Sequence, residues 1–161
     1  MTKKTICRNK DDSKFEVETE DLEFRPSVYG LIFNKDKSKI LLSKQWDGYD
    51  YPGGGINKGE RLREALKREV YEEVGVKIEG GKLVECADDF YLSKEGKALH
   101  SILMFYVIDK FEGKPSIKNI DKTEEDYING FEWLDVRSVN KIKFYNPMDN
   151  KKLVQKALKI I

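Results

Sequence analysis

The sequence predicts one α/β domain in which helices pack on a mixed β-sheet. Several apolar runs of strand length are separated by turn residues, and two amphipathic stretches have helical spacing. The 161 residues contain no internal repeat and no linker rich in Pro, Ser or Gly, which fits the size of one domain. Hydrophobic residues make up 39% and aromatic residues 11%, which is too much for a disordered chain.

Charge and cysteine content exclude several classes of protein. The 30 basic residues nearly balance the 29 acidic residues, which argues against a dedicated nucleic-acid surface and against a polyanionic tail. The basic N-terminus is not followed by an apolar segment, and the longest apolar run, residues 102–108, is too short for a membrane helix. Cys7 and Cys86 lie far apart and are expected to be reduced thiols. These features favour a cytoplasmic protein that does not bind membranes.

The first third of the chain predicts an arm followed by a hairpin. Residues 1–24 are polar and charged, with weak alternation over 15–18, which is compatible with a loose N-terminal arm containing one edge strand. The domain proper is expected over residues 25–161. Its apolar runs at 27–33 and 40–43 flank the polar turn 34–39, a pattern typical of a β-hairpin.

The remaining elements alternate between helix and strand. A loop leads through residues 46–52 to the glycines 53–55, and a helix is expected over 60–74, where Gly75 provides the stop signal. Strands are expected over 82–91, 99–111 and 128–134. Residues 150–161 have helical spacing of their apolar side chains and predict a C-terminal helix.

Three carboxylates of the first predicted helix point to chemistry. Glu69, Glu72 and Glu73 have spacing i, i+3, i+4, so they share one face. That face borders the apolar stripe formed by Leu62, Leu66, Val70 and Val74. Carboxylates at the edge of a buried surface repel one another and lose hydration, and a hard divalent cation such as Mg²⁺ would offset both costs. The alternative is a solvated acidic face paired with Lys67, Arg68 and Lys77.

The wider pattern favours the chemical alternative. Residues 54–76 match G-x5-E-x7-R-E-U-x-E-E-x-G-U, where U is a bulky aliphatic residue, and every fixed position is filled: Gly54, Glu60, Arg68, Glu69, Val70, Glu72, Glu73, Gly75 and Val76. With this motif the chain resembles the MutT-like Nudix hydrolase family. The resemblance extends from about residue 27 to the C-terminus and leaves residues 1–24 uncovered.

The resemblance implies a fold and a reaction. The Nudix fold is an α/β/α sandwich with a mixed β-sheet, in which the motif forms a loop-helix-loop. Its members hydrolyse a phosphoanhydride bond in a nucleoside diphosphate linked to another moiety, using Mg²⁺ or Mn²⁺. Small-molecule nucleotides are the implied partners: a nucleoside triphosphate, a dinucleoside polyphosphate or a nucleotide sugar. Removal of pyrophosphate from RNA 5′ ends and a non-catalytic nucleotide-sensing role are the alternatives. Homodimers are frequent in the family, so the oligomeric state stays open.

The resemblance also assigns roles to individual residues. Glu69 and Glu73 are the expected principal metal ligands, and Glu72 is expected to bind a second metal or orient water. The Gly53 carbonyl is a candidate further ligand. Arg68 is expected to pair with Glu60 and to position a neighbouring glutamate. Gly54 and Gly75 are expected to matter for backbone geometry.

The general base and the substrate contacts are less fixed by the motif. In some family members the base is a motif glutamate, and in others it comes from a later loop, where Glu124 lies here; Glu69 and Glu72 are the alternatives. Tyr91 resembles a tyrosine found downstream of the motif in some dinucleoside polyphosphate hydrolases, and a core position is its alternative. Trp46 could stack on a base and Arg25 could contact phosphates.

Overall fold

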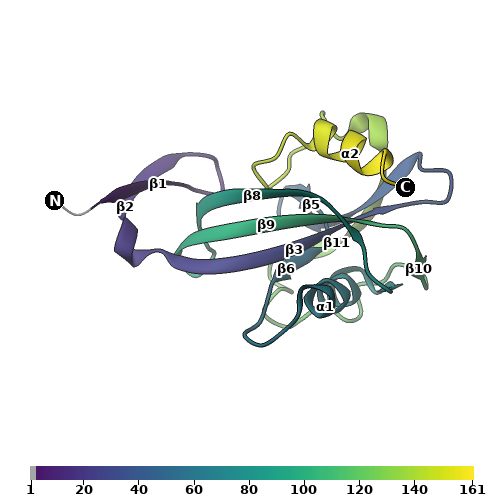
Figure 1. Cartoon of the computed structure of the whole chain (residues 1–161), viewed down its shortest axis with the longest axis horizontal. Helices are drawn as coiled ribbons and strands as arrows, with labels where there is room; N and C mark the ends of the chain where they lie inside the picture. The colour runs from purple at the N-terminus through teal and green to yellow at the C-terminus, as the bar shows by residue number, and fades with distance from the viewer. Residues whose placement is uncertain (1–2) are drawn as a thin grey trace.

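A mixed β-sheet with one α-helix on each face organises the protein (Figure 1). The computed structural model describes residues 3–161. The main sheet has the strand order β11-β4-β3-β9-β8-β1-β2; β5 pairs with β4, β6 pairs with β3, and β7 and β10 form a separate pair. The strands are β1 (Lys4–Arg8), β2 (Lys14–Glu18), β3 (Glu23–Phe33), β4 (Lys39–Gln45), β5 (Gly48–Asp50), β6 (Gly53–Gly55), β7 (Lys77–Ile78), β8 (Lys82–Leu92), β9 (Ala98–Ile108), β10 (Phe111–Glu112) and β11 (Ile128–Asp135); the helices are α1 (Leu62–Val74) and α2 (Asn150–Leu158).

Two hydrophobic cores lie on opposite faces of this sheet. In β9, Phe105 and Val107 belong to the core beneath α2, whereas Met104 and Tyr106 pack against the core beneath α1. This alternation is the period of a strand whose two faces are both covered. The predicted α/β/α sandwich with a mixed sheet is therefore confirmed.

The strand predictions hold with shifted ends. The hairpin of β3 and β4 and the hairpin of β8 and β9 are both antiparallel, while β3 and β9 pair in parallel in the centre of the sheet. The expected strand 99–111 ends at Ile108, because Phe111 and Glu112 pair instead with β7. None of the helices formed by residues 3–161 is long and apolar enough to cross a membrane.

The helix predictions need small corrections that have local causes. Helix α1 begins at Leu62 rather than at residue 60, because the Glu60 carboxylate accepts the Asn57 backbone N–H in the preceding turn. Leu62 is 43% exposed and does not join the buried stripe, whereas Ala65 is fully buried. Helix α2 ends at Leu158, and the following residues form tighter bonds, such as the one from Ile160 N–H to the Ala157 carbonyl.

The N-terminal segment is more ordered than a loose arm with one strand. Strands β1 and β2 form an antiparallel hairpin, and Arg8 pairs in parallel with Tyr91 of β8. In Figure 1 this hairpin extends the sheet away from both helices. The alternation over residues 15–18 is weak because none of the residues of β2 is buried. In β1, Cys7 is fully buried, whereas Ile6 is 61% exposed.

Gly75 ends α1 in a left-handed backbone conformation that favours glycine. Its φ is 70° and its N–H donates to the Tyr71 carbonyl, as in a left-handed helix cap. A Cβ at this position would lie 2.7 Å from the Ser116 carbonyl oxygen. Gly96 has a similar φ of 79° but open space around it, so it provides a matched control.

We predict that Gly75→Ala destabilises the protein more than Gly96→Ala does. The control should lower the free energy of unfolding by about 1 kcal/mol, the cost of a left-handed alanine. The Gly75 variant adds the displacement of the Ser116 backbone. Urea unfolding of both variants measures the difference, and equal losses would show that the Ser116 contact has no cost.

Candidate active site

Glycines of β6 let the carboxylates of α1 approach the sheet closely. A Cβ on Gly54 would lie 2.7 Å from a carboxylate oxygen of Glu69. A Cβ on Gly53 would lie 2.1 Å from the Val28 carbonyl oxygen, which is part of the sheet backbone. The Gly53 N–H also donates to Glu73 at 3.3 Å. Absence of side chains in this strand is therefore what allows helix and strand to meet at the motif.

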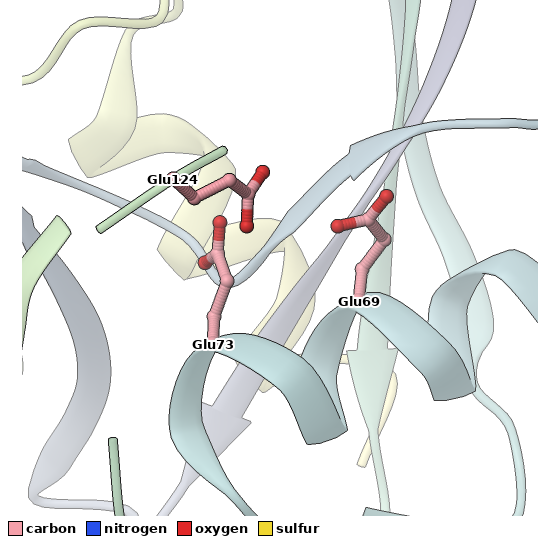
Figure 2. A group of neighbouring side chains, drawn as sticks. All are labelled: Glu69, Glu73 and Glu124. Atoms are coloured by element: carbon pink, nitrogen blue, oxygen red, sulfur yellow. The ribbon is translucent and has the colours of Figure 1, made fainter. Parts of the chain in front are cut away.

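Three carboxylates converge at this junction. Oxygen atoms of Glu69, Glu73 and Glu124 all lie within 4.8 Å of one another. Figure 2 shows Glu69 and Glu73 rising side by side from α1 and Glu124 reaching them from the opposite side. Glu69 is 5% exposed and Glu73 is 1% exposed. Glu124 comes from the loop before β11, so the chain folds over the helix to complete the cluster.

The cluster has too little positive charge for its burial. Burial raises the pKa of Glu69 to about 7, although the Arg68 guanidinium acts in the opposite direction. Burial, together with the charges of Glu124 and Glu69, raises the pKa of Glu73 well above its ordinary value. Burial also raises the pKa of Glu124, and the Tyr127 hydroxyl partly offsets this by donating to Oε1 at 3.0 Å. A cation at this position would stabilise all three ionised forms.

The donor set fits a hard divalent cation. The Oε2 atom of Glu124 is buried and has no hydrogen-bond partner among residues 3–161. Such an orphaned acceptor beside two further buried carboxylates is costly unless a ligand satisfies it. Carboxylate oxygens are the ligands that Mg²⁺ and similar cations prefer. Glu69, Glu73 and Glu124 are the residues placed to hold such an ion.

Arg68 organises the rest of the motif. Its guanidinium makes a bidentate pair with Glu60, with Nε–Oε1 at 2.7 Å and Nη2–Oε2 at 2.9 Å. The same group donates to Glu69 at 2.8 Å, to Glu72 at 3.1 Å and to the Gly55 carbonyl at 3.1 Å. These contacts hold the pKa of Arg68 above its ordinary value, chiefly through Glu60. The expected pairing of Arg68 with Glu60 is thus present, and it joins the loop before α1 to the helix.

Glu72 lies differently from the other motif carboxylates. It faces Arg68 and is outside the group of oxygens within 4.8 Å that Glu69, Glu73 and Glu124 form. The structure therefore brings the loop residue Glu124, rather than Glu72, to the two buried glutamates of α1. Helical spacing could place Glu72 on the same face as Glu69 and Glu73. It could not show that the Glu72 side chain would bond Arg68 instead of joining the two carboxylates.

The three residues expected to contact substrate line one cleft. A hollow of about 450 Å³ runs from Gly53, Glu73 and Glu124 past Arg25 and Tyr91 to Trp46. Arg25 Nη1 donates to the Tyr91 hydroxyl at 3.1 Å, so a residue of β3 and one of β8 form one wall together. The Trp46 ring stacks on Tyr127 with ring centroids 5.0 Å apart. The cleft therefore connects the carboxylate cluster to an aromatic surface.

Sequence reasoning missed the polar floor of this cleft. Asp50 and Asn146 are 7% and 9% exposed, and Asn146 Nδ2 donates to Asp50 Oδ1 at 2.7 Å. Arg8 makes a bidentate pair with the buried Asp89, with bonds of 2.8 and 2.6 Å. These partners come from distant parts of the chain and match no spacing rule. Of these four residues, only Asp50 stands out in the sequence itself, as a single acid between the aromatic residues 49 and 51.

Comparison with known proteins identifies the family. The family model of the NUDIX domain matches residues 23–156. An 8-oxo-dGTP diphosphatase from Buchnera aphidicola is 28% identical over 145 residues, covering 87% of this chain and 98% of that protein. An RNA pyrophosphohydrolase from Ectopseudomonas mendocina is 40% identical over 65 residues, covering 39% of this chain and 40% of that protein. The chain thus spans nearly all of the first relative and under half of the second.

Solved structures agree on the fold. A MutT structure from work on the Aliivibrio salmonicida and Vibrio cholerae proteins has a TM-score of 0.61 at 22% identity, covering 86% of this chain and all of that chain. A MutT NUDIX hydrolase from Burkholderia pseudomallei has a TM-score of 0.61 at 20% identity, covering 83% of this chain and 98% of that one. The chain belongs to the NUDIX domain family. The prediction of an enzyme, a Nudix pyrophosphohydrolase, is confirmed.

Asp50 makes the stability of the protein depend on pH. Burial raises its pKa to about 6, against which the bonds from Asn146 and the Tyr51 N–H act only in part. In the unfolded chain its pKa is about 4. Between these values the unfolded state releases the proton while the folded state retains it, so stability falls as pH rises from about 4 to about 6.

We predict that Asp50→Asn removes this loss. Both bonds to the carboxylate go to Oδ1, so an amide oxygen can keep them. Relative to wild type, the variant should gain about 2–3 kcal/mol of unfolding free energy between pH 4 and pH 7.5, from about 1.36 kcal/mol per pKa unit. Urea unfolding at both pH values measures it, with the exposed Asp126→Asn as control. Parallel pH profiles for wild type and Asp50→Asn would refute the assignment.

Proposed function

We propose that the protein hydrolyses a phosphoanhydride bond in a nucleoside diphosphate linked to another moiety, with Mg²⁺ or Mn²⁺ as cofactor. The observation that carries this proposal is the cluster of Glu69, Glu73 and Glu124 at one end of a cleft of about 450 Å³. That volume is in the range of small-molecule sites. The Buchnera relative, 98% of whose length is matched, is named an 8-oxo-dGTP diphosphatase, and this name supports a nucleoside triphosphate as substrate.

The chain's own residues divide the work of the reaction. Glu69 and Glu73 would hold the divalent cation, which when bound supplies positive charge against the diphosphate and Lewis acidity. Glu124, whose oxygen lies within 4.8 Å of theirs, is then left for the attacking water. Arg68 is a positioning residue: its bond to Glu69 fixes that carboxylate, and its pair with Glu60 fixes the loop. Arg25 lies beside Gly55 and would bind a phosphate oxygen with its guanidinium, which favours bidentate contacts.

Glu124 is the proposed general base. Its Oε1 is held by Tyr127, which leaves the buried Oε2 free to accept a proton from an attacking water. Since burial raises its pKa, the carboxylate is a stronger proton acceptor than an exposed glutamate. Glu69 and Glu72 each already accept a hydrogen bond from Arg68, so both are weaker proton acceptors for a water.

A turnover screen tests the proposed function. Phosphate or pyrophosphate release should be measured with nucleoside triphosphates including 8-oxo-dGTP, dinucleoside polyphosphates, ADP-ribose and nucleotide sugars, each with Mg²⁺ and with Mn²⁺. We expect turnover of at least one class, dependent on the metal. If none of these substrates turns over with either metal, the proposal is refuted.

We predict that Glu73→Gln removes both activity and metal-dependent stabilisation. Wild type should gain about 2.7 kcal/mol of stability at a metal concentration 100-fold above Kd, and the variant should gain little. Turnover should fall by at least about 100-fold. Without metal, the variant should be no less stable than wild type, because an amide removes a buried carboxylate with a raised pKa.

Thermal melting with and without Mg²⁺ measures the stabilisation of wild type and Glu73→Gln by the metal, and the turnover assay measures their activity. The exposed Glu79→Gln is the control. Metal stabilisation that persists in Glu73→Gln would place the ion elsewhere.

We predict that Glu124→Gln lowers kcat by about 10²–10⁴-fold, the usual contribution of a positioned base. The neighbouring Glu125 is exposed, and its substitution by Gln should have little effect, so it is a matched control. A pH profile of kcat for both variants separates the base from its neighbours. If Glu124→Gln matches the control, the base is Glu69 or Glu72 instead.

A further inference from the structure

The N-terminal hairpin reaches the cleft although it lies outside the matched NUDIX range of residues 23–156. Arg8, Asn9 and Lys10, at the start of its turn, all line the cleft. The turn is fixed in place, because Arg8 forms its ion pair with the buried Asp89 and also donates to the Tyr145 carbonyl at 2.7 Å. A bidentate charged pair of this kind, with a further bond to a backbone carbonyl, holds one geometry. The hairpin is therefore a built part of the cleft wall.

Trp46 is held at the same end of the cleft in a costly conformation. Its φ is 43°, in the left-handed region that a bulky residue rarely adopts. The surrounding structure enforces it, since the Trp46 N–H donates to the Tyr127 carbonyl at 3.0 Å and its own carbonyl accepts from Asn129 Nδ2 at 3.2 Å. The residue nevertheless stays 38% exposed. Strain that keeps a large aromatic side chain at a cleft surface is typical of binding sites.

Two lysines complete this aromatic surface. Lys10 Nζ lies 3.8 Å from the centre of the Trp46 ring, and Lys94 Nζ lies 4.5 Å from the centre of the Tyr127 ring. The two rings are only 5.0 Å apart, so each ammonium must lie on the outward face of its ring. The groups therefore run in the order Lys94, Tyr127, Trp46, Lys10. Tyr127 joins this row to the carboxylate cluster, because its hydroxyl donates to Glu124.

A second hollow continues the cleft at the far end of the row. Asn9, Lys10, Trp46, Leu92, Lys94 and Lys143 are among the residues lining it. Lys143 is already paired with Asp47 at 3.0 Å. Lys10 has no carboxylate within 4.0 Å among residues 3–161, where its contacts are with aromatic rings. Lys94 donates to the Thr123 carbonyl and lies 4.0 Å from a carboxylate oxygen of Glu95. Of the three lysines named here, Lys10 therefore remains available for an anion.

We propose that Lys10 and Trp46 form a second substrate subsite, which binds a phosphate of a nucleotide joined to the one that is cleaved. A lone ammonium fixed over an aromatic face is suited to a phosphate oxygen. Lys10 lies on the face of Trp46 away from Tyr127, the ring that is bonded to Glu124, and it lines the second hollow as well as the cleft. We therefore assign this phosphate to the part of the substrate beyond the nucleotide that is cleaved. This inference rests on the proposed function of the same cleft. The hairpin then determines how long a substrate the enzyme prefers.

The test compares a short substrate with two extended ones. ATP, diadenosine tetraphosphate and a 5′-triphosphorylated dinucleotide are assayed with wild type, Lys10→Gln and Lys10→Arg. We expect Lys10→Gln to lower kcat/KM for an extended substrate about fivefold more than for ATP, mainly through KM, with a weaker salt dependence. Lys10→Arg should restore the ratio. The two extended arms show whether the phosphate comes from a dinucleoside polyphosphate or from an oligonucleotide.

Lys14→Gln is the matched control, because Lys14 lies on the same hairpin with an exposed side chain. It should leave the ratios as in wild type. Equal losses on all three substrates in Lys10→Gln, or no loss on any, would overturn the subsite.

A binding assay separates this inference from the proposed function. If wild type turns over nothing, the proposed function has failed, and binding of the same three nucleotides is measured without metal through the fluorescence of the protein's tryptophans. Wild type should bind an extended nucleotide more tightly than ATP, and Lys10→Gln should lose that preference. Absence of the preference in wild type, or its retention in Lys10→Gln, would overturn the subsite on its own.

Discussion

The Arg68 guanidinium is the interaction on which the site depends. It is the cation that allows α1 to carry several carboxylates on a face pressed against the sheet, because it bonds Glu60, Glu69 and Glu72 at once. It also ties the loop before the helix to the glycine strand through the Gly55 carbonyl. Without it, the charges beside the core would have to be neutralised by protonation. Arg68 cannot neutralise the whole group, and the remaining uncompensated charge is what suits the cluster to a cation.

Close packing and charge act together here. The absence of a side chain at Gly54 lets strand β6 lie against Glu69 of the helix, and the absence of one at Gly53 lets β6 lie against β3. Glu69 and Glu73 are buried at this junction. Burial raises the pKa of both groups and strengthens any interaction with a cation, since the surrounding dielectric is low. The same geometry would be destabilising in a protein that did not bind an ion. Local packing and chemistry are therefore two results of one arrangement of backbone and helix.

The parts of this site that could be predicted are those encoded within one short stretch of chain. The pairing of Arg68 with Glu60 and the stop at Gly75 follow from spacing along one helix and its flanking turns. Glu124 could be proposed but not placed, because its position depends on a loop folding over α1. The bonds between Asp50 and Asn146 and between Arg8 and Asp89 join residues 96 and 81 positions apart, and no periodicity reports such pairs. The N-terminal hairpin gives only a weak alternation in the sequence, because Cys7 is the one buried residue in its two strands.

The central parallel pairing of β3 with β9 has a consequence for how the protein is made. The Ser101 hydroxyl bonds the Arg25 carbonyl across 76 positions of sequence, and the whole of α1 lies between them. During synthesis α1, which carries Glu69 and Glu73, therefore leaves the ribosome before the strand that completes the sheet beneath it. Until β9 arrives, the apolar faces of β3 and α1 have no full partner. Contacts of such long range form slowly and favour exposed intermediates, so folding of this enzyme should be governed by the arrival of its second half.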